Sequence, residues 1–155
     1  MSDNSTDLKM KRGVDFIGVT CVFFCHDGEG NLLMHKRSDN CRDEQGRWDC
    51  GGGSLKVGED PIDAVKREIK EEYCADAEEI QFVTMTNVLR TREDGVQTHW
   101  IALVHTAKVD PSQVQIGEPT EMDDIGWFKP DGFPEPMHSA CPNHLELVKP
   151  HIPNL

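Results

Sequence analysis

The chain lacks both long apolar stretches and an excess of basic residues. No run approaches the ~18 apolar residues that a membrane-spanning helix requires, and the polar N-terminus has no apolar signal-peptide core. Lys and Arg number 16 against 28 Asp and Glu, which leaves a formal net charge of −12. Such a charge opposes binding to the backbone of DNA or RNA. We therefore expect a cytoplasmic protein that binds neither membranes nor nucleic-acid backbones.

The cysteine spacing of zinc sites and disulfide frameworks is also missing. The six cysteines form no Cys-x-x-Cys pair, and no histidine follows them at zinc-finger spacing. We expect them to be reduced and structural, as is usual in a cytosolic protein. Neither an internal repeat nor a linker divides the chain. We expect a flexible tail over residues 1–12 and one domain over residues 13–155.

The hydrophobic pattern predicts a mixture of strands and helices. Runs rich in apolar and β-branched residues predict strands over 16–25, 32–36, 80–90, 98–109 and 125–128. A side-chain acceptor followed by proline, Asp60-Pro61, marks a helix start, and apolar residues then recur at helical spacing up to Tyr73. A short helix is expected over 145–148, and 48–55 is glycine-rich and short. This order predicts an α/β fold in which helices cover a mixed β-sheet.

Three glutamates are gathered on one side of the predicted central helix. Glu68, Glu71 and Glu72 are spaced at i, i+3 and i+4, which places their side chains together. Like charges so placed repel each other, so such a cluster either stays in water or binds a cation. Convergent carboxylates suit a hard divalent ion such as Mg²⁺. From the glutamates alone, a solvated acidic helix face is the better interpretation.

The residues around these glutamates resemble the Nudix box. The box positions are matched by Gly53, Glu59, Arg67, Glu68, Ile69, Glu71 and Glu72. Cys74 stands where the pattern has its last glycine, near the helix C-terminus, where a left-handed backbone is often required. The resemblance extends to the flanking segments 48–52 and 125–128, and it implies the Nudix α/β/α sandwich around a mixed sheet.

The resemblance also implies chemistry. It makes Glu68, Glu71 and Glu72, with a backbone carbonyl at Gly53, the ligands of Mg²⁺, for which Mn²⁺ can substitute. Arg67 would hold a box glutamate in place, and Glu59 would fix the loop. The implied activity is hydrolysis of a diphosphate linkage in a nucleoside diphosphate derivative, so the expected partner is a small nucleotide.

The substrate remains open among several classes. The short chain favours a nucleoside triphosphate pyrophosphohydrolase, whereas an ADP-ribose or nucleotide-sugar pyrophosphatase is the main alternative. A non-catalytic, regulatory nucleotide-binding Nudix domain is a further interpretation, although the complete set of box carboxylates argues against it. The sequence also leaves open whether the chain forms a homodimer.

Candidate residues outside the box complete the expected site. In the family a further glutamate often acts as ligand or base; Glu118 and Glu121 are candidates here, and the offset from the 125–128 segment favours Glu121. Lys36 and Arg37 end the second predicted strand and are candidates to bind substrate phosphates. Solvated surface positions are equally good interpretations for all four. Arg42 and Arg47 are weaker candidates, and Trp48 is expected to pack in the core.

Overall fold

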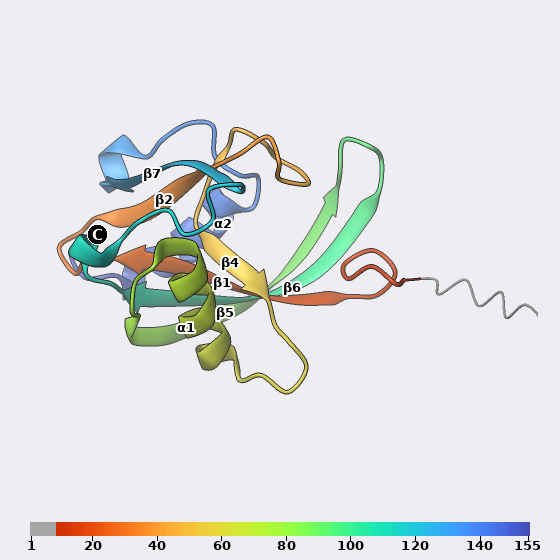
Figure 1. The fold of residues 1–155 in the computed structure, drawn as a ribbon. Coiled ribbons are helices and arrows are strands. Elements are labelled where there is room, and N and C mark those ends of the chain that lie inside the picture. The colour runs from red at the N-terminus through yellow and green to blue at the C-terminus, as the bar shows by residue number, and fades with distance from the viewer. Residues whose placement is uncertain (1–8) are drawn as a thin grey trace, which may run out of the picture.

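A seven-stranded mixed sheet forms the centre of the structure, a computed structural model that describes residues 9–155 (Figure 1). The strands are β1 (Gly18–His26), β2 (Leu32–Arg37), β3 (Trp48–Asp49), β4 (Gly51–Ser54), β5 (Glu78–Thr91), β6 (Gln97–Lys108) and β7 (Met122–Phe128). The α-helices are α1 (Pro61–Tyr73) and α2 (Cys141–Val148), and single 3₁₀ turns cover Pro111–Gln113, Pro130–Gly132 and Lys149–His151.

The sheet is mixed because one central pair is parallel. The strand order is β3-β2-β1-β6-β5, while β4 pairs with β1 and β7 with β2. Strands β1 and β6 run parallel over their whole shared length, and every other pair is antiparallel. Strands β1 and β2 pair only at their ends, His26 with Leu32, so they diverge from there. This divergence leaves space between the two halves of the sheet.

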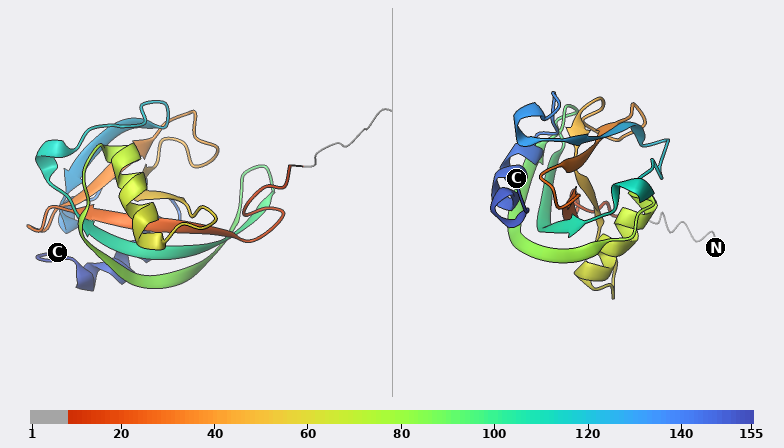
Figure 2. Two further views of the ribbon diagram at one scale, coloured as in Figure 1. Left: turned by 60° about the horizontal axis from the view of Figure 1, so that its bottom comes forward. Right: turned by 90° about the vertical axis from the view of Figure 1, so that its left-hand side faces the viewer.

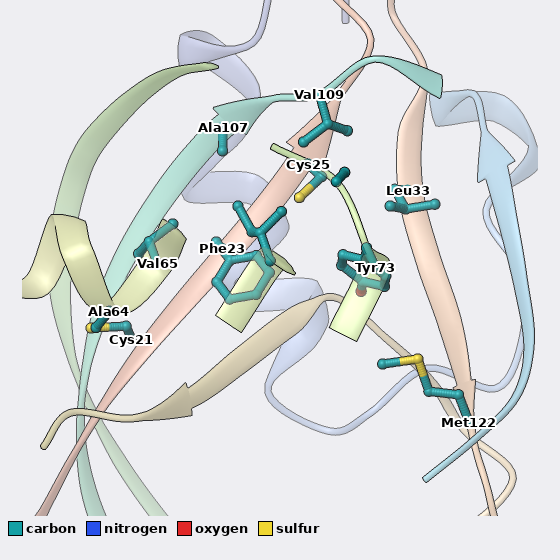
Figure 3. Packing of buried hydrophobic residues seen from close by; sticks show 12 residues of the cluster. Cys21, Phe23, Cys25, Leu33, Ala64, Val65, Tyr73, Ala107, Val109 and Met122 are labelled. Atoms are coloured by element: carbon teal, nitrogen blue, oxygen red, sulfur yellow. The ribbon is translucent and has the colours of Figure 1, made fainter. Parts of the chain in front are cut away.

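The two α-helices cover opposite faces of the sheet (Figure 2). Alternate residues of a strand point to opposite faces, and β1 uses both of its faces. Phe23 packs with the apolar side of α1, edge-on to Tyr73 with ring centroids 6.3 Å apart (Figure 3). Phe24 instead joins the cluster that contains Leu145 and Val148 of α2. The predicted α/β fold is therefore confirmed.

Most predicted elements are present, with shifted ends. The first strand begins at Gly18 rather than at Phe16, because the preceding residues form a turn in which the Gly13 N–H bonds to the Phe16 carbonyl at 2.7 Å. Residues 1–8 of the expected tail lie outside the described residues, and Arg12 forms a β-bridge with Phe16. Among residues 9–155, none of the helices has the length and apolar character needed to cross a bilayer.

The glycine-rich segment 48–55 contains two short strands. These are β3 and β4, and Gly51, Gly52 and Gly53 lie in β4, paired antiparallel to β1. Glycine is required at Gly51 because a Cβ atom there would overlap the ring of Phe23. At this position the missing side chain admits a core aromatic ring.

Helix α1 has well-defined ends. The Asp60 side chain accepts a hydrogen bond from the Ile62 N–H at 2.9 Å, and Pro61 follows as the first helical residue. The helix ends at Cys74, which has φ 59° and donates its N–H to the Lys70 carbonyl at 3.1 Å. Cys74 thus adopts the left-handed conformation that favours glycine. All six cysteines are free, and Cys74 is the exposed one.

Candidate active site

The C-terminal half of α1 faces β4 through its glutamates. A Cβ atom added at Gly53 would overlap the carboxylate of Glu68, so the absence of a side chain there allows the close approach. The Gly53 carbonyl accepts a hydrogen bond from the Thr20 hydroxyl at 3.0 Å. A carbonyl oxygen has two lone pairs, so this oxygen can still serve as a ligand.

Arg67 contacts the carboxylates of three box residues. Its Nε donates to Glu59 Oε1 at 2.7 Å and its Nη2 to Glu59 Oε2 at 3.1 Å. Its Nη1 donates to Glu68 Oε1 at 2.6 Å and reaches Glu71 Oε2 at 3.3 Å. The pKa of Glu59 is lowered to about 2, mainly by the hydrogen bonds from Arg67. Glu59 also accepts the Lys56 N–H at 3.1 Å and thereby ties down the loop before α1.

Glu72 is the buried member of the glutamate cluster. Its side chain is 7% exposed, and its Oε2 atom has no hydrogen-bond partner within residues 9–155. Burial raises the pKa of Glu72 well above its usual range, and the charges of Glu68 and Glu118 raise it further. An orphaned carboxylate oxygen beside other carboxylates is costly without a compensating charge. The residues present therefore fit a hard divalent cation.

Outside the box, the structure places Glu118 rather than Glu121 against the cluster. Burial raises the pKa of Glu118, with contributions from Glu68, Glu71 and Glu121. Glu121 is exposed, and its Oε2 atom accepts a hydrogen bond from the Cys41 thiol at 3.3 Å. Sequence offset alone could not separate these glutamates, because both precede β7 in the same loop.

A cavity of about 310 Å³ opens beside the glutamate cluster, between the diverging halves of the sheet. Glu72 and β4 line one part of it, and Trp100 of β6 lines another. The Trp100 indole packs closely on Gly13 and Gly18, where an added Cβ atom would overlap its ring. Arginines line the cavity as well: Arg12, Arg37, Arg42, Arg90 and Arg92.

A network centred on Arg90 builds one wall of the cavity. Arg90 Nη2 pairs with Asp43 at 2.8 Å, and its Nη1 pairs with Glu44 at 3.0 Å. Glu44 also pairs with His138 Nε2 at 2.6 Å and accepts the Ser139 N–H at 3.1 Å. The network therefore ties the loop after β2 to β5 and to the segment that precedes α2.

The predicted phosphate-binding residues divide between cavity and surface. Arg37 lines the cavity and pairs with Asp43 at 3.2 Å and Asp49 at 3.6 Å. Lys36 does not line it, because adjacent strand residues point to opposite faces.

The remaining predictions near the cavity divide in the same way. Arg42 lines it, whereas Arg47 donates to the Met137 carbonyl at 3.0 Å. Trp48 packs edge-on against Phe128, as expected for a core residue, with ring centroids 5.2 Å apart. Sequence reasoning missed Arg12, Arg90 and Arg92, which carry no local motif.

Comparisons with known proteins agree with this geometry. A family model described as the NUDIX domain matches residues 16–148. The crystal structure of a MutT NUDIX hydrolase from Burkholderia pseudomallei is similar, with a TM-score of 0.75, 29% identity and coverage of 85% of this chain and 98% of that chain. The NUDIX domain of Shewanella oneidensis NrtR, solved with ADP-ribose, shares the fold at 17% identity, with a TM-score of 0.66 and coverage of 92% and 90%.

Two curated relatives are also named as hydrolases. An RNA pyrophosphohydrolase from Gluconacetobacter diazotrophicus is 25% identical over 125 residues, which cover 70% of this chain and 75% of that protein. An uncharacterised Nudix hydrolase from Yersinia pestis is 26% identical over 128 residues, which cover 79% of this chain but only 64% of that protein. Because the family model spans most of the chain and includes the glutamate-bearing helix, this chain belongs to the Nudix family.

Proposed function

We propose that the chain is a divalent-metal-dependent hydrolase that cleaves a phosphoric anhydride in a nucleoside diphosphate derivative. The observation that carries this proposal is the buried, unpartnered Oε2 atom of Glu72, located where the glutamate cluster meets an arginine-lined cavity. Membership of the Nudix family and the names of its relatives as hydrolases support the same activity.

Four residues would hold the metal. They are Glu68, Glu71, Glu72 and the backbone carbonyl of Gly53, an all-oxygen set that suits Mg²⁺ or Mn²⁺. A cation bound there would neutralise charge on the phosphate oxygens and activate a water molecule. Arg67 contributes by holding Glu68 in position through its 2.6 Å hydrogen bond, while Glu59 anchors the opposite side of the guanidinium.

Glu118 is the residue that we assign as the proton acceptor. Its carboxylate lies among the charges of the box, and burial together with these charges raises its pKa. A higher pKa makes a carboxylate a better base near neutral pH. Glu118 would therefore take the proton of the attacking water as the bond to phosphorus forms and the anhydride bond breaks.

The cavity limits the size of the nucleotide part of the substrate. Its volume of about 310 Å³ is at the lower end for small-molecule sites, which suits one nucleoside rather than two. Nucleoside triphosphates, cleaved to a monophosphate and pyrophosphate, are the first class to test. ADP-ribose and other nucleotide sugars are the second, and the fold shared with a domain that was solved with ADP-ribose supports their inclusion.

The test is phosphate release from nucleoside triphosphates, nucleotide sugars and dinucleoside polyphosphates, with Mg²⁺ and a coupling phosphatase or pyrophosphatase. We expect metal-dependent turnover of one class and its loss in Glu72→Gln. The variant Glu93→Gln, in the β5–β6 turn, makes the same chemical change away from the site and should keep full activity. If none of these substrates is turned over while nucleotides still bind, the result would instead indicate a non-catalytic, regulatory domain.

A further inference from the structure

Arginine is unevenly distributed in this acidic protein. Five of the seven arginines in the sequence line the cavity beside the box, whereas none of the lysines among residues 9–155 does. An arginine guanidinium presents planar donors that bind a phosphate in two places at once, which a lysine ammonium does not. On a chain with a net charge of −12, such a cluster forms a local region that attracts anions.

Internal ion pairs account for only part of the cluster. Arg37 pairs with Asp43 and Asp49, Arg90 with Asp43 and Glu44, and Arg92 with Asp94. For Arg12 and Arg42, in contrast, no acidic partner is present in the part of the chain that the structure describes. These two guanidinium groups come from separate loops, before β1 and after β2, and both line the cavity.

The sheet register separates most of these arginines from the box. On β1, Cys21 lies opposite Gly53, and Gly18 lies opposite Trp100. These positions are three residues apart, or about 10 Å along the strand. Arg90 lies opposite Thr98, which is two residues farther from the box than Trp100.

The loop before β1 reaches the same end of the cavity. The His99 N–H bonds to the Gly13 carbonyl at 2.8 Å, and Figures 1 and 2 both show this loop beside the β5–β6 turn. By backbone register, Arg12 and Arg90 therefore lie on the side of Trp100 that is away from the box.

We propose that Arg12 and Arg42, supported by Arg90, bind a second phosphate that the substrate carries on its ribose. The inference rests on the hydrolase function proposed above, since it assumes that the scissile anhydride lies at the box glutamates. One nucleoside would then bridge the two ends of the cavity. A cavity of about 310 Å³ accommodates one nucleoside, so we place the second phosphate on the ribose of that nucleoside.

The experiment compares substrates that differ only by this phosphate. The pairs are ADP-ribose with ADP-ribose 2′-phosphate and 3′-dephospho-coenzyme A with coenzyme A, assayed for kcat/KM at constant ionic strength. In a second experiment without metal, calorimetry measures the dissociation constants of AMP, adenosine 2′,5′-bisphosphate and adenosine 3′,5′-bisphosphate. If the hydrolysis assays show that the protein prefers a base other than adenine, the corresponding nucleotides of that base are used in place of the adenine nucleotides. We expect the phosphorylated member to be preferred about tenfold or more, as for hydrogen bonds to charged groups.

Matched variants identify the residues responsible. Arg12→Gln and Arg42→Gln should each lower kcat/KM more for the phosphorylated member of a pair than for the unphosphorylated member, and thereby reduce the preference. Arg47→Gln is the control, because it removes the same charge from the same loop as Arg42 but lies on the Met137 carbonyl. It should retain the preference. Thermal unfolding of each variant verifies that it is folded.

The outcomes separate this inference from the proposed function. Equal kcat/KM within every pair, with anhydride hydrolysis intact, overturns the second-phosphate site and leaves the hydrolase. An equal loss for both members of a pair in Arg12→Gln and Arg42→Gln also overturns it, because the arginines would then act only through general charge. If no hydrolysis is found but a bisphosphate binds more tightly than AMP, and this difference depends on these arginines, then the second-phosphate site is supported and the hydrolase function is contradicted.

Discussion

Arg67 engages both carboxylate oxygens of Glu59, with its Nε 2.7 Å from Oε1 and its Nη2 3.1 Å from Oε2. This two-point contact leaves Nη1 directed at Glu68, 2.6 Å away. The orientation of one carboxylate of the proposed metal site therefore depends on a residue in the loop before the helix. Such a contact is geometric as well as electrostatic, so a lysine at position 67 would not reproduce it.

The Glu59–Arg67 pair predicts a pH dependence of stability. The pKa of Glu59 is lowered from 4.5 to about 2 in the folded protein, so its contribution is fully present above pH 4.5 and is lost as the pH falls through about 2. We expect Glu59→Gln to lower the melting temperature at neutral pH and to show a shallower decline between pH 4.5 and pH 2. Melting curves across this range provide the check. Identical slopes for Glu59→Gln, Glu93→Gln and the unchanged protein would contradict the prediction.

Glu72→Gln separates stability from activity. Burial raises the pKa of Glu72, so its ionised form destabilises the metal-free protein as the pH rises above the usual carboxyl range. We expect the variant to melt no lower than the unchanged protein without metal and to lose the increase in melting temperature that Mg²⁺ produces. Turnover should fall at least about a hundredfold, because changing even residues that merely orient a ligand costs ~10–100-fold. Activity that survives this substitution would remove Glu72 from the metal site.

Glu118 and Glu121 can be distinguished by their glutamine variants. If Glu118 accepts the proton, Glu118→Gln should lower kcat by about a hundredfold, the lower limit of the usual contribution of a general base. It should also remove the acidic limb of the pH–rate profile. Glu121→Gln should retain that limb and most of kcat, because Glu121 is exposed and its side chain accepts a hydrogen bond from Cys41. The reverse pattern would restore the assignment that the sequence favours.

Cys74→Gly should stabilise the protein. Cys74 adopts φ 59° at an exposed helix end, where a side chain costs about 1–2 kcal/mol relative to a right-handed conformation. Glycine avoids that cost but increases the entropy of the unfolded chain, so we expect a net gain of roughly 0.5–1 kcal/mol in the free energy of unfolding. Denaturant titration measures it, with activity unchanged. Cys74→Ala retains the Cβ atom and should give no comparable gain.

Local features explain what could be predicted from the sequence. Helix α1 was predictable because its cap, its apolar spacing and its glutamates are close neighbours in the chain. The cavity was not, because its arginines come from positions 12, 37, 42, 90 and 92 and meet only through strand register. Lys36 illustrates the same limit. It is adjacent to Arg37 in sequence, yet the alternation of β2 directs the two side chains to opposite faces.

The network around Arg90 has a consequence for the order in which the site assembles. It joins positions 43–44, 90 and 138–139, so closing it requires segments up to 95 residues apart in the sequence to meet. Contacts between such distant positions carry a large loop-closure cost during folding, whereas the contacts of Arg67 with Glu68 and Glu71 are local. The contacts of Arg67 with Glu68 and Glu71 can therefore form in a partly folded chain before the cavity wall around Arg90 is complete.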